Sequence, residues 1–359
     1  VRGGNFEWEN VGNLGAADAA DHTSMVYDGL NQQIYVVYRD VYNDSNAVIK
    51  TFKNGSWVLS GRFQTPASYI DMVSFDGQTY IVFNDNNVAD PGRVTVERLF
   101  AGDGPDGGDL WKSVGNPHFA YTGTTPVRIA VNSSTYQPVI VYSDTVNSGR
   151  ALVKEFNGQS WVNVGTWVSE GRAIEPSIAF SPTDNQPYVV YIDSSNMFRV
   201  TVKTFKNGIW MSVGNYDGVI SPGPAVQTKI AFNPINNQPY VVYTDMFNSK
   251  QISVVTLKEG DWVNVGKPNF SPGGASYPDI AFNPLNNYPT VVYQDAKNSG
   301  KATVMNFDGE SWVIVGASGF SSGIANDAGM VFNLSNNQPY IVYSDGSDQG
   351  KPVVMTFSN

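Results

Sequence analysis

The sequence contains no cysteine and only two histidines among its 359 residues. Without cysteine there is no disulfide framework, no thiolate zinc site and no cysteine nucleophile. His22 and His118 are far apart in the sequence and make a poor metal-ligand set, so we expect both to lie in surface loops of different repeats. No run approaches 18 consecutive apolar residues, so the sequence predicts no membrane-spanning helix.

Basic residues are also scarce. Lys and Arg number 22 against 32 Asp and Glu, which gives a formal net charge of −10. This balance argues against nucleic acid as a partner, because phosphate binding needs clustered cations. A chain without cysteine that begins at Val1 rather than Met is compatible with a processed, exported protein. We therefore expect a secreted or cell-surface protein that requires no cofactor.

Tryptophan is the most informative residue that is present. Seven of the eight tryptophans fall on the template Trp-x-x-Val-Gly or a near variant, and successive ones are 49, 54, 50, 49, 52 and 50 residues apart. A period of this size with strand-like content predicts a propeller. The seven are Trp8, Trp57, Trp111, Trp161, Trp210, Trp262 and Trp312.

Each repeat contains four short runs rich in Val, Ile, Tyr and Phe, the composition of β-strands. In one representative repeat these runs are 229–232, 239–243, 252–257 and 262–265. Asn-Pro and Asn-Gly turns separate them, as expected for antiparallel hairpins. Four strands per repeat predict one blade each, and seven blades closing a ring would bury both faces of the inner strands.

The two ends of the chain complement each other. The sequence begins with the fourth strand of a repeat, around Trp8, and finishes with the first three strands of a last repeat. We predict that residues 1–12 complete the blade formed by 324–359, which would leave no unpaired strand edge. The whole chain, 1–359, is then a single all-β domain, a seven-bladed β-propeller.

Three motifs recur along the chain: Tyr-Val-Val-Tyr-x-Asp, Lys-x-x-Val-x-x-Phe and Trp-Val-x-Val-Gly. With these motifs the whole chain resembles a family of bacterial secreted or surface propeller repeats. A weaker likeness is to lectin propellers of the tachylectin and Photorhabdus type, whose repeats have similar length and a Trp near the end. The resemblance implies the fold more specifically than the function.

An aspartate follows the last aromatic residue of the second strand by two positions in every repeat. These carboxylates would share one face of the disc and could attract cations, metals or basic partners. They could instead accept backbone N–H bonds and fix the following turn. We favour the structural role, because all seven repeats share the feature. The set is Asp40, Asp85, Asp144, Asp193, Asp245, Asp295 and Asp345.

The loop 166–176 departs most from its counterparts and holds Trp167, Glu170, Arg172 and Glu175. A glycosidase needs two carboxylates at a defined separation, which makes Glu170 and Glu175 the candidate catalytic residues. Trp167 and Arg172 are the candidate ligand-binding residues beside them. The alternative, which we favour, is an irregular solvated loop.

A hairpin insertion carries Asp103, Asp106 and Asp109, and oxygen ligands at this spacing suit calcium. The EF-hand pattern is not met, so a flexible charged hairpin tip is the favoured alternative. Elsewhere, Phe119, Phe270 and Phe320 lie in the loops between repeats, where they could form platforms for neutral sugars. The favoured alternative is that these rings pack between blades.

These features favour binding over catalysis, because similar repeats carry no concentrated catalytic set. We expect a lectin-like or adhesin-like module that recognises carbohydrate at loops or grooves between blades. Two alternatives remain open: a protein-interaction scaffold that uses the acidic face or the central channel, and a polysaccharide hydrolase or lyase.

Overall fold

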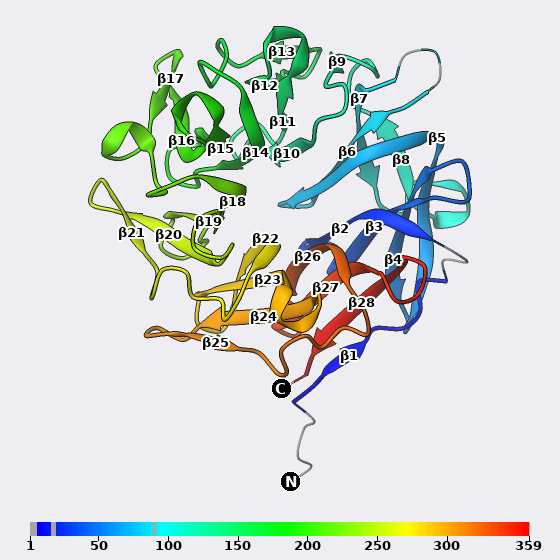
Figure 1. Ribbon diagram of the computed structural model, residues 1–359. Helices are drawn as coiled ribbons and strands as arrows, with labels where there is room; N and C mark the ends of the chain where they lie inside the picture. Colours follow the sequence, from blue (N-terminus) through cyan, green and yellow to red (C-terminus); the bar gives the residue numbers. More distant parts are fainter. Residues whose placement is uncertain (1–5, 16–18, 88, 90, 359) are drawn as a thin grey trace.

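The computed structural model describes residues 6–15, 19–87, 89 and 91–358. Within this part the strands form five four-stranded antiparallel sheets and one eight-stranded sheet. The sheets follow one another in chain order around a ring, with the first described strand beside the last (Figure 1). The fold is therefore all-β and propeller-like. None of the described helices has the length and apolar character needed to cross a membrane.

The innermost strands meet one another around the centre of the ring, and each packs against the innermost strand of the next sheet, with β26 against β2. They are β2 (Ala20–Asp28), the second half of β5 (Ser56–Phe75), β10 (Val127–Val131), β14 (Ala173–Phe180), β18 (Ala225–Phe232), β22 (Ala275–Phe282) and β26 (Ala325–Asn333).

The second and third strands of each repeat follow outward. The second strands are β3 (Gln33–Asp40), β6 (Gln78–Asp85), β11 (Pro138–Asp144), β15 (Pro187–Asp193), β19 (Pro239–Asp245), β23 (Pro289–Asp295) and β27 (Gln338–Asp345). The third strands are β4 (Asn46–Lys53), β7 (Arg93–Phe100), β12 (Arg150–Phe156), β16 (Arg199–Lys206), β20 (Ile252–Lys258), β24 (Lys301–Phe307) and β28 (Lys351–Phe357).

The outermost strands carry the template tryptophans. They are β1 (Trp8–Asn10), the first part of β5, β8 (Leu110–Ser113), β13 (Trp161–Asn163), β17 (Ile209–Ser212), β21 (Asp261–Asn264) and β25 (Trp312–Ile314). A short strand, β9 (Ala120–Tyr121), pairs with β7. Five 3₁₀ turns complete the described elements: η1 (Pro105–Gly107), η2 (Thr145–Asn147), η3 (Ser194–Asn196), η4 (Tyr216–Gly218) and η5 (Ala296–Asn298).

Strand β5 explains the single large sheet. It pairs with β4 through its first half and with β6 through its second half. A loop was expected between these two halves, but a single strand runs from Ser56 to Phe75. Two four-stranded units are therefore joined by one continuous strand.

The first strand of the chain belongs to the same sheet as the last three. Strand β1 pairs antiparallel with β28, with Trp8 opposite Phe357, and the strand order is β1-β28-β27-β26. The Trp8 indole stacks on Phe320 with ring centroids 4.4 Å apart, and its Nε1 donates a hydrogen bond to Val315 O at 2.9 Å. Residues more than 300 positions apart are thus held together by pairing and by packing.

The hydrophobic core lies between neighbouring sheets. One cluster joins Val190 and Val202 of one sheet to Ile230, Val241 and Tyr243 of the next, and all five side chains are buried. Burial of Val, Ile and Tyr on both faces of a strand explains why the second strands are almost continuously apolar in sequence.

The Trp-x-x-Val-Gly template describes a contact between repeats. Six of the seven indoles donate a hydrogen bond from Nε1 to a carbonyl oxygen of the preceding repeat around the ring. The acceptor is the Val of that repeat's template. Trp111 donates instead to Ser60 Oγ at 3.2 Å, where Ser replaces the Val. The six pairs are Trp8 with Val315, Trp57 with Val11, Trp161 with Val114, Trp210 with Val164, Trp262 with Val213 and Trp312 with Val265.

The template glycine makes room for the same indole. Gly266 has φ of 70°, and a Cβ there would lie 2.9 Å from Phe307 and 3.1 Å from Trp312. We expect Gly266→Ala to lower the free energy of unfolding by about 2–4 kcal/mol, combining overpacking with backbone strain. Gly260→Ala is the matched control, since its φ is 86° but no atom lies within 4 Å of its would-be Cβ. Urea unfolding that gave equal losses for both variants would contradict the packing role.

Candidate functional site: the central cavity

The innermost strands begin with an irregularity. In six of the seven, the register against the second strand shifts close to the first residues of the strand. Beside these shifts, five residues other than glycine have a positive φ: His22 (50°), Tyr69 (48°), Glu175 (52°), Tyr277 (52°) and Asp327 (52°). Such conformations cost about 1–3 kcal/mol each and are concentrated at functional sites. Bulges of this kind redirect side chains.

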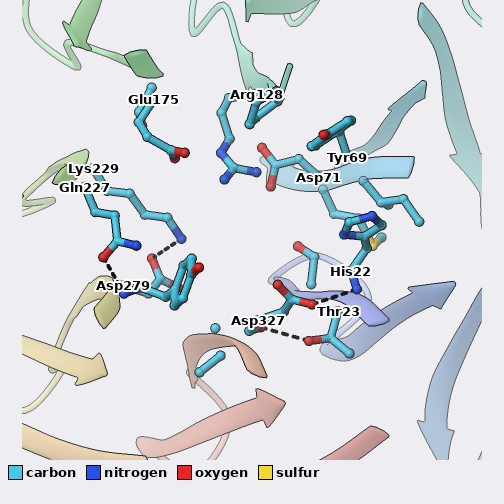
Figure 2. A pocket seen from close by; sticks show the side chains of 18 of the residues that line it. His22, Thr23, Tyr69, Asp71, Arg128, Glu175, Gln227, Lys229, Asp279 and Asp327 are labelled. Atoms are coloured by element: carbon cyan, nitrogen blue, oxygen red, sulfur yellow. Dashed lines mark hydrogen bonds and ion pairs between the residues drawn. The ribbon is translucent and has the colours of Figure 1, made fainter. Parts of the chain in front are cut away.

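The redirected side chains line a cavity of about 510 Å³ at the centre of the ring (Figure 2). Two sets of seven residues, one from each innermost strand or its start, surround it. The first ring is His22, Tyr69, Pro126, Glu175, Gln227, Tyr277 and Asp327. The second ring, two residues further along each strand, is Ser24, Asp71, Arg128, Ser177, Lys229, Asp279 and Gly329.

The repeats carry different residue types at the positions of these two rings. No residue type occurs more than twice in either ring, whereas the template Trp and the strand-end Asp occur in every repeat. A catalytic or selective binding site needs convergent and unequal groups. The central cavity meets that condition. Sequence reasoning missed it, although the signal was present as two variable positions inside an otherwise regular strand.

Four acceptors in the rings connect one innermost strand to the next. Each accepts a hydrogen bond from a backbone N–H of the following innermost strand, so these side chains also hold neighbouring sheets together. The bonds run from His22 N to Asp327 Oδ2 (2.9 Å), Tyr277 N to Gln227 Oε1 (2.7 Å), Ile129 N to Asp71 Oδ2 (3.1 Å) and Met330 N to Asp279 Oδ2 (3.0 Å).

Two charged side chains in the cavity have no hydrogen-bond or ion-pair partner among the described residues. Lys229 is paired with Asp279 at 3.3 Å, but the side chains of Arg128 and Glu175 make no hydrogen bond or ion pair within the described residues. In Figure 2 the Arg128 guanidinium points into the cavity, between Glu175 and Asp71. The cavity therefore offers strong donors and acceptors to a ligand.

Burial shifts the pKa values of two groups in the cavity in opposite directions. Burial lowers the pKa of His22, against the opposing charge of Asp21, so its imidazole is neutral at pH 7 and offers one donor and one acceptor. Burial raises the pKa of Asp71, and the Arg128 charge opposes that rise. Among the described residues, no three His, Asp or Glu side chains are grouped so that they could hold a metal ion.

The prediction that both histidines lie in surface loops was wrong for His22. This residue belongs to β2 and lines the cavity, with its ring 5.6 Å from that of Tyr69. His118 does lie between strands, but its Nε2 is 2.7 Å from Asp85 Oδ2, so it is tied to a strand-end aspartate.

The residues of loop 166–176 are separated rather than gathered. Strand β14 begins at Ala173, so Glu175 is part of an innermost strand and faces the central cavity. Trp167 lines a groove at the side of the ring, and Glu170 and Arg172 are exposed and line neither space. The grouping was wrong because the residues before the apolar run were expected to be a loop. Catalysis by Glu170 and Glu175 stays a prediction without a shared site.

The loop aromatics pack between repeats. Phe119, Phe270 and Phe320 are half-buried, and each stacks almost parallel on a template indole. Faces used in this way are not available as platforms for a sugar. Phe119 also lines the groove that holds Trp167. The centroid distances are 4.1 Å for Phe119 with Trp161, 4.0 Å for Phe270 with Trp312 and 4.4 Å for Phe320 with Trp8.

The strand-end aspartates make the bonds expected of turn caps. Five of them accept a hydrogen bond from the backbone N–H two residues later: Asp85, Asp193, Asp245, Asp295 and Asp345. The remaining two, Asp40 and Asp144, accept from the side-chain amide of an Asn three residues later. Committed in this way, they have few free lone pairs for an external cation.

Asp85 provides a pH-dependent test of this capping. Burial alone would raise the pKa of Asp85, but hydrogen bonds from Thr65, His118 and Asn87 outweigh it and lower the pKa. Because the folded pKa lies below the unfolded one, the stabilisation is present above the unfolded value and is lost as pH falls through the folded value. We expect Asp85→Asn to reduce stability by about 1–3 kcal/mol at pH 7 and by much less at pH 2–3. Urea midpoints measured across pH 2–7 would check this, and an equal loss at every pH would contradict it.

The Asp103–Asp109 hairpin does not assemble a metal site in the described structure. Both oxygens of Asp109 are used, since Oδ1 accepts from Gly102 N at 3.2 Å and Oδ2 accepts from Ser60 Oγ at 2.7 Å. Asp106 lies in η1 with φ of 56°, and no group of three suitable ligands occurs among the described residues. Calcium binding stays a prediction that this geometry does not favour.

Comparisons with known proteins bear on the fold. No protein-family model matches the chain, and no curated protein sequence matches it. Among solved structures the chain is similar to the BP39L lectin from Burkholderia pseudomallei, with a TM-score of 0.66 and 16% identity over 94% of this chain and 95% of the lectin. It is also similar to a protein of unknown function from Dyadobacter fermentans, with a TM-score of 0.51 and 12% identity over 86% and 96% of the two chains. At these identities the likeness establishes the all-β, propeller-like fold alone.

Proposed function

We propose that this protein is a lectin-like, carbohydrate-binding protein that holds a saccharide in its central cavity. The observation that carries the proposal is the set of five strained residues that direct unlike polar and aromatic side chains into one space. A cavity of about 510 Å³ also falls in the range typical of small-molecule sites. The fold shared with a lectin is consistent with this proposal.

The chemistry of the cavity suits a polyhydroxylated ligand. A sugar hydroxyl both donates and accepts hydrogen bonds, and Arg128, Glu175 and the neutral His22 supply both kinds of partner. Tyr277 is 55% exposed and offers an aromatic surface beside them. Charges of both signs, with Lys229 already paired, favour a neutral or zwitterionic ligand over a polyanion.

We further propose that the seven repeats form seven blades of one domain, closed by the first strand of the chain, and that the protein is secreted or displayed at a cell surface. The pairing of β1 with β28 and the contact between β26 and β2 support the closure. The absence of cysteine is compatible with export without oxidative folding.

A glycan array tests the carbohydrate function directly. We expect the wild-type protein to bind a limited set of glycans and the Arg128→Gln and Glu175→Gln variants to lose at least about tenfold in affinity, or about 1.4 kcal/mol each. Glu310→Gln, in an exposed turn, is the matched control and should bind as the wild type does. The absence of binding to any glycan would refute the proposal, and so would unchanged binding by both cavity variants.

A further inference from the structure

A groove at the side of the ring, here called the basic groove, differs in charge from the rest of the molecule. It has a volume of about 410 Å³ and is lined by Tyr142, Asp144, Lys154, Asn163 and Trp167 among others. The Arg150 guanidinium lies over the Trp167 ring, 4.1 Å from its centroid. Cations and an aromatic surface therefore meet in a protein whose net charge is −10.

Two cations are held at the basic groove, Lys154 as part of its lining and Arg150 against the Trp167 ring. Arg150 Nε donates to Asn147 O at 3.3 Å, and Lys154 Nζ donates to Asn163 Oδ1 at 2.7 Å. Neither side chain forms an ion pair within the described residues. The carboxylate in the groove, Asp144, is buried and accepts a hydrogen bond from Asn147 Nδ2. The outer nitrogens of Arg150 remain available for a bidentate contact with an anionic group.

The chain contains a second groove with the same framework, here called the matched groove. It is lined by Tyr243, Asp245 and Asn264, which are equivalent to Tyr142, Asp144 and Asn163. Strand pairing fixes the equivalence, since Lys154 lies opposite Asn163 and Val255 lies opposite Asn264. The backbone bonds of the following loops agree: Val168 N donates to Ala151 O, and Phe270 N donates to Ile252 O.

Three of the differences between the two grooves concern the charge and the indole. Gln251, Val255 and Asn269 occupy the positions equivalent to Arg150, Lys154 and Trp167, and of these Val255 and Asn269 line the matched groove. The fold thus accepts neutral residues at all three positions, and the charge and the indole of the basic groove are not needed to build it. Side chains that the framework does not need are candidates for recognition.

We propose that the basic groove is a second binding site, for a saccharide that carries anionic groups, either carboxylate or sulfate. The proposal rests on the carbohydrate function proposed above but uses a different site. The indole and the guanidinium stacked on it provide a flat, preorganised surface for the sugar, and Lys154 and Arg150 meet its charges. The negative charge of the whole protein opposes long polyanions, so the groove favours a short anionic segment over nucleic acid.

The test compares oligosaccharides of equal length by calorimetry: dextran sulfate, oligogalacturonate and unmodified dextran. We expect at least one anionic probe to bind at least tenfold more tightly than dextran, with an affinity that falls as salt is raised. The tighter of the two anionic probes identifies the source of the charge. Equal binding of anionic and neutral probes would overturn the proposal, as would tighter binding of a single-stranded oligonucleotide.

Variants then locate the site. Arg150→Gln with Lys154→Val copies the matched groove and should lose at least tenfold in affinity for the anionic probe; adding Trp167→Asn should lose more. The control, Lys203→Val with Lys301→Gln, removes two charges from equivalent positions in other repeats and should stay within about twofold of wild type. An unchanged double variant, or an equal loss in the control, would overturn the proposal. Glu175→Gly with Tyr277→Gly should keep the anionic binding while losing neutral glycans, so the two sites can fail separately.

Discussion

Replacing Trp8 with alanine is expected to destabilise the protein by about 3–5 kcal/mol, as much as a buried aromatic residue elsewhere in the core. The Trp8 residue is 9% exposed, stacks on Phe320, contacts Phe357 and donates to Val315 O. All three partners lie near the other end of the chain. Losing the indole would therefore open a cavity and weaken the only described outer strand of the last sheet.

Trp262→Ala is the matched comparison, because Trp262 makes the same template bond, to Val213 O, in the middle of the chain. Urea unfolding should show losses of similar size for the two variants. If Trp8→Ala cost less than about 1 kcal/mol while Trp262→Ala cost several, the first strand would not close the ring.

Glycine at Glu175 and Tyr277 is expected to abolish most glycan binding with little change in stability. Both residues have φ of 52°, a conformation that glycine adopts without strain. Relief of that strain offsets the larger conformational entropy that glycine gives the unfolded chain. We expect each variant to unfold within about 1 kcal/mol of wild type, whereas glycan affinity falls at least tenfold.

Ser276→Gly is the control for this pair of variants. Ser276 neighbours Tyr277 in β22 and is not among the residues with positive φ, so glycine there should lose about 0.5–1 kcal/mol without affecting binding. Thermal unfolding and calorimetry on the same samples measure both quantities. Large losses of stability in Glu175→Gly and Tyr277→Gly with intact binding would show that these side chains serve the fold instead.

The repeat architecture was largely predictable because its signals are local. The spacing of Trp residues, the Asn-Gly turns and the apolar runs each depend on a few neighbouring residues. The all-β, propeller-like fold is confirmed. The partner of each template indole was not predictable from one repeat, since Trp262 donates to Val213 of the preceding one. The role of the template glycine was not predictable either, because it depends on a contact between two sheets.

The candidate site was predicted poorly, for a different physical reason. Strand β18 begins at Ala225, but the apolar run that marks it in sequence begins near 229. The residues in between, 225–228, include Gln227 and Thr228 and resemble a loop, although they belong to a strand whose bulge turns Gln227 toward the centre. Glu175 was therefore grouped with Trp167 and Arg172 by sequence distance, whereas its neighbours in space are Arg128 and Gln227 from other repeats.

The central claim is that the repeats are scaffold and that the function lies where their innermost strands differ. The number of neutral glycan molecules bound per chain tests this most directly, because a central cavity is unique whereas grooves between repeats recur. Calorimetric titration of the strongest neutral ligand from the array should give one site per chain, lost in the Glu175→Gly and Tyr277→Gly double variant. A stoichiometry of several sites per chain, unchanged in that variant, would contradict the claim.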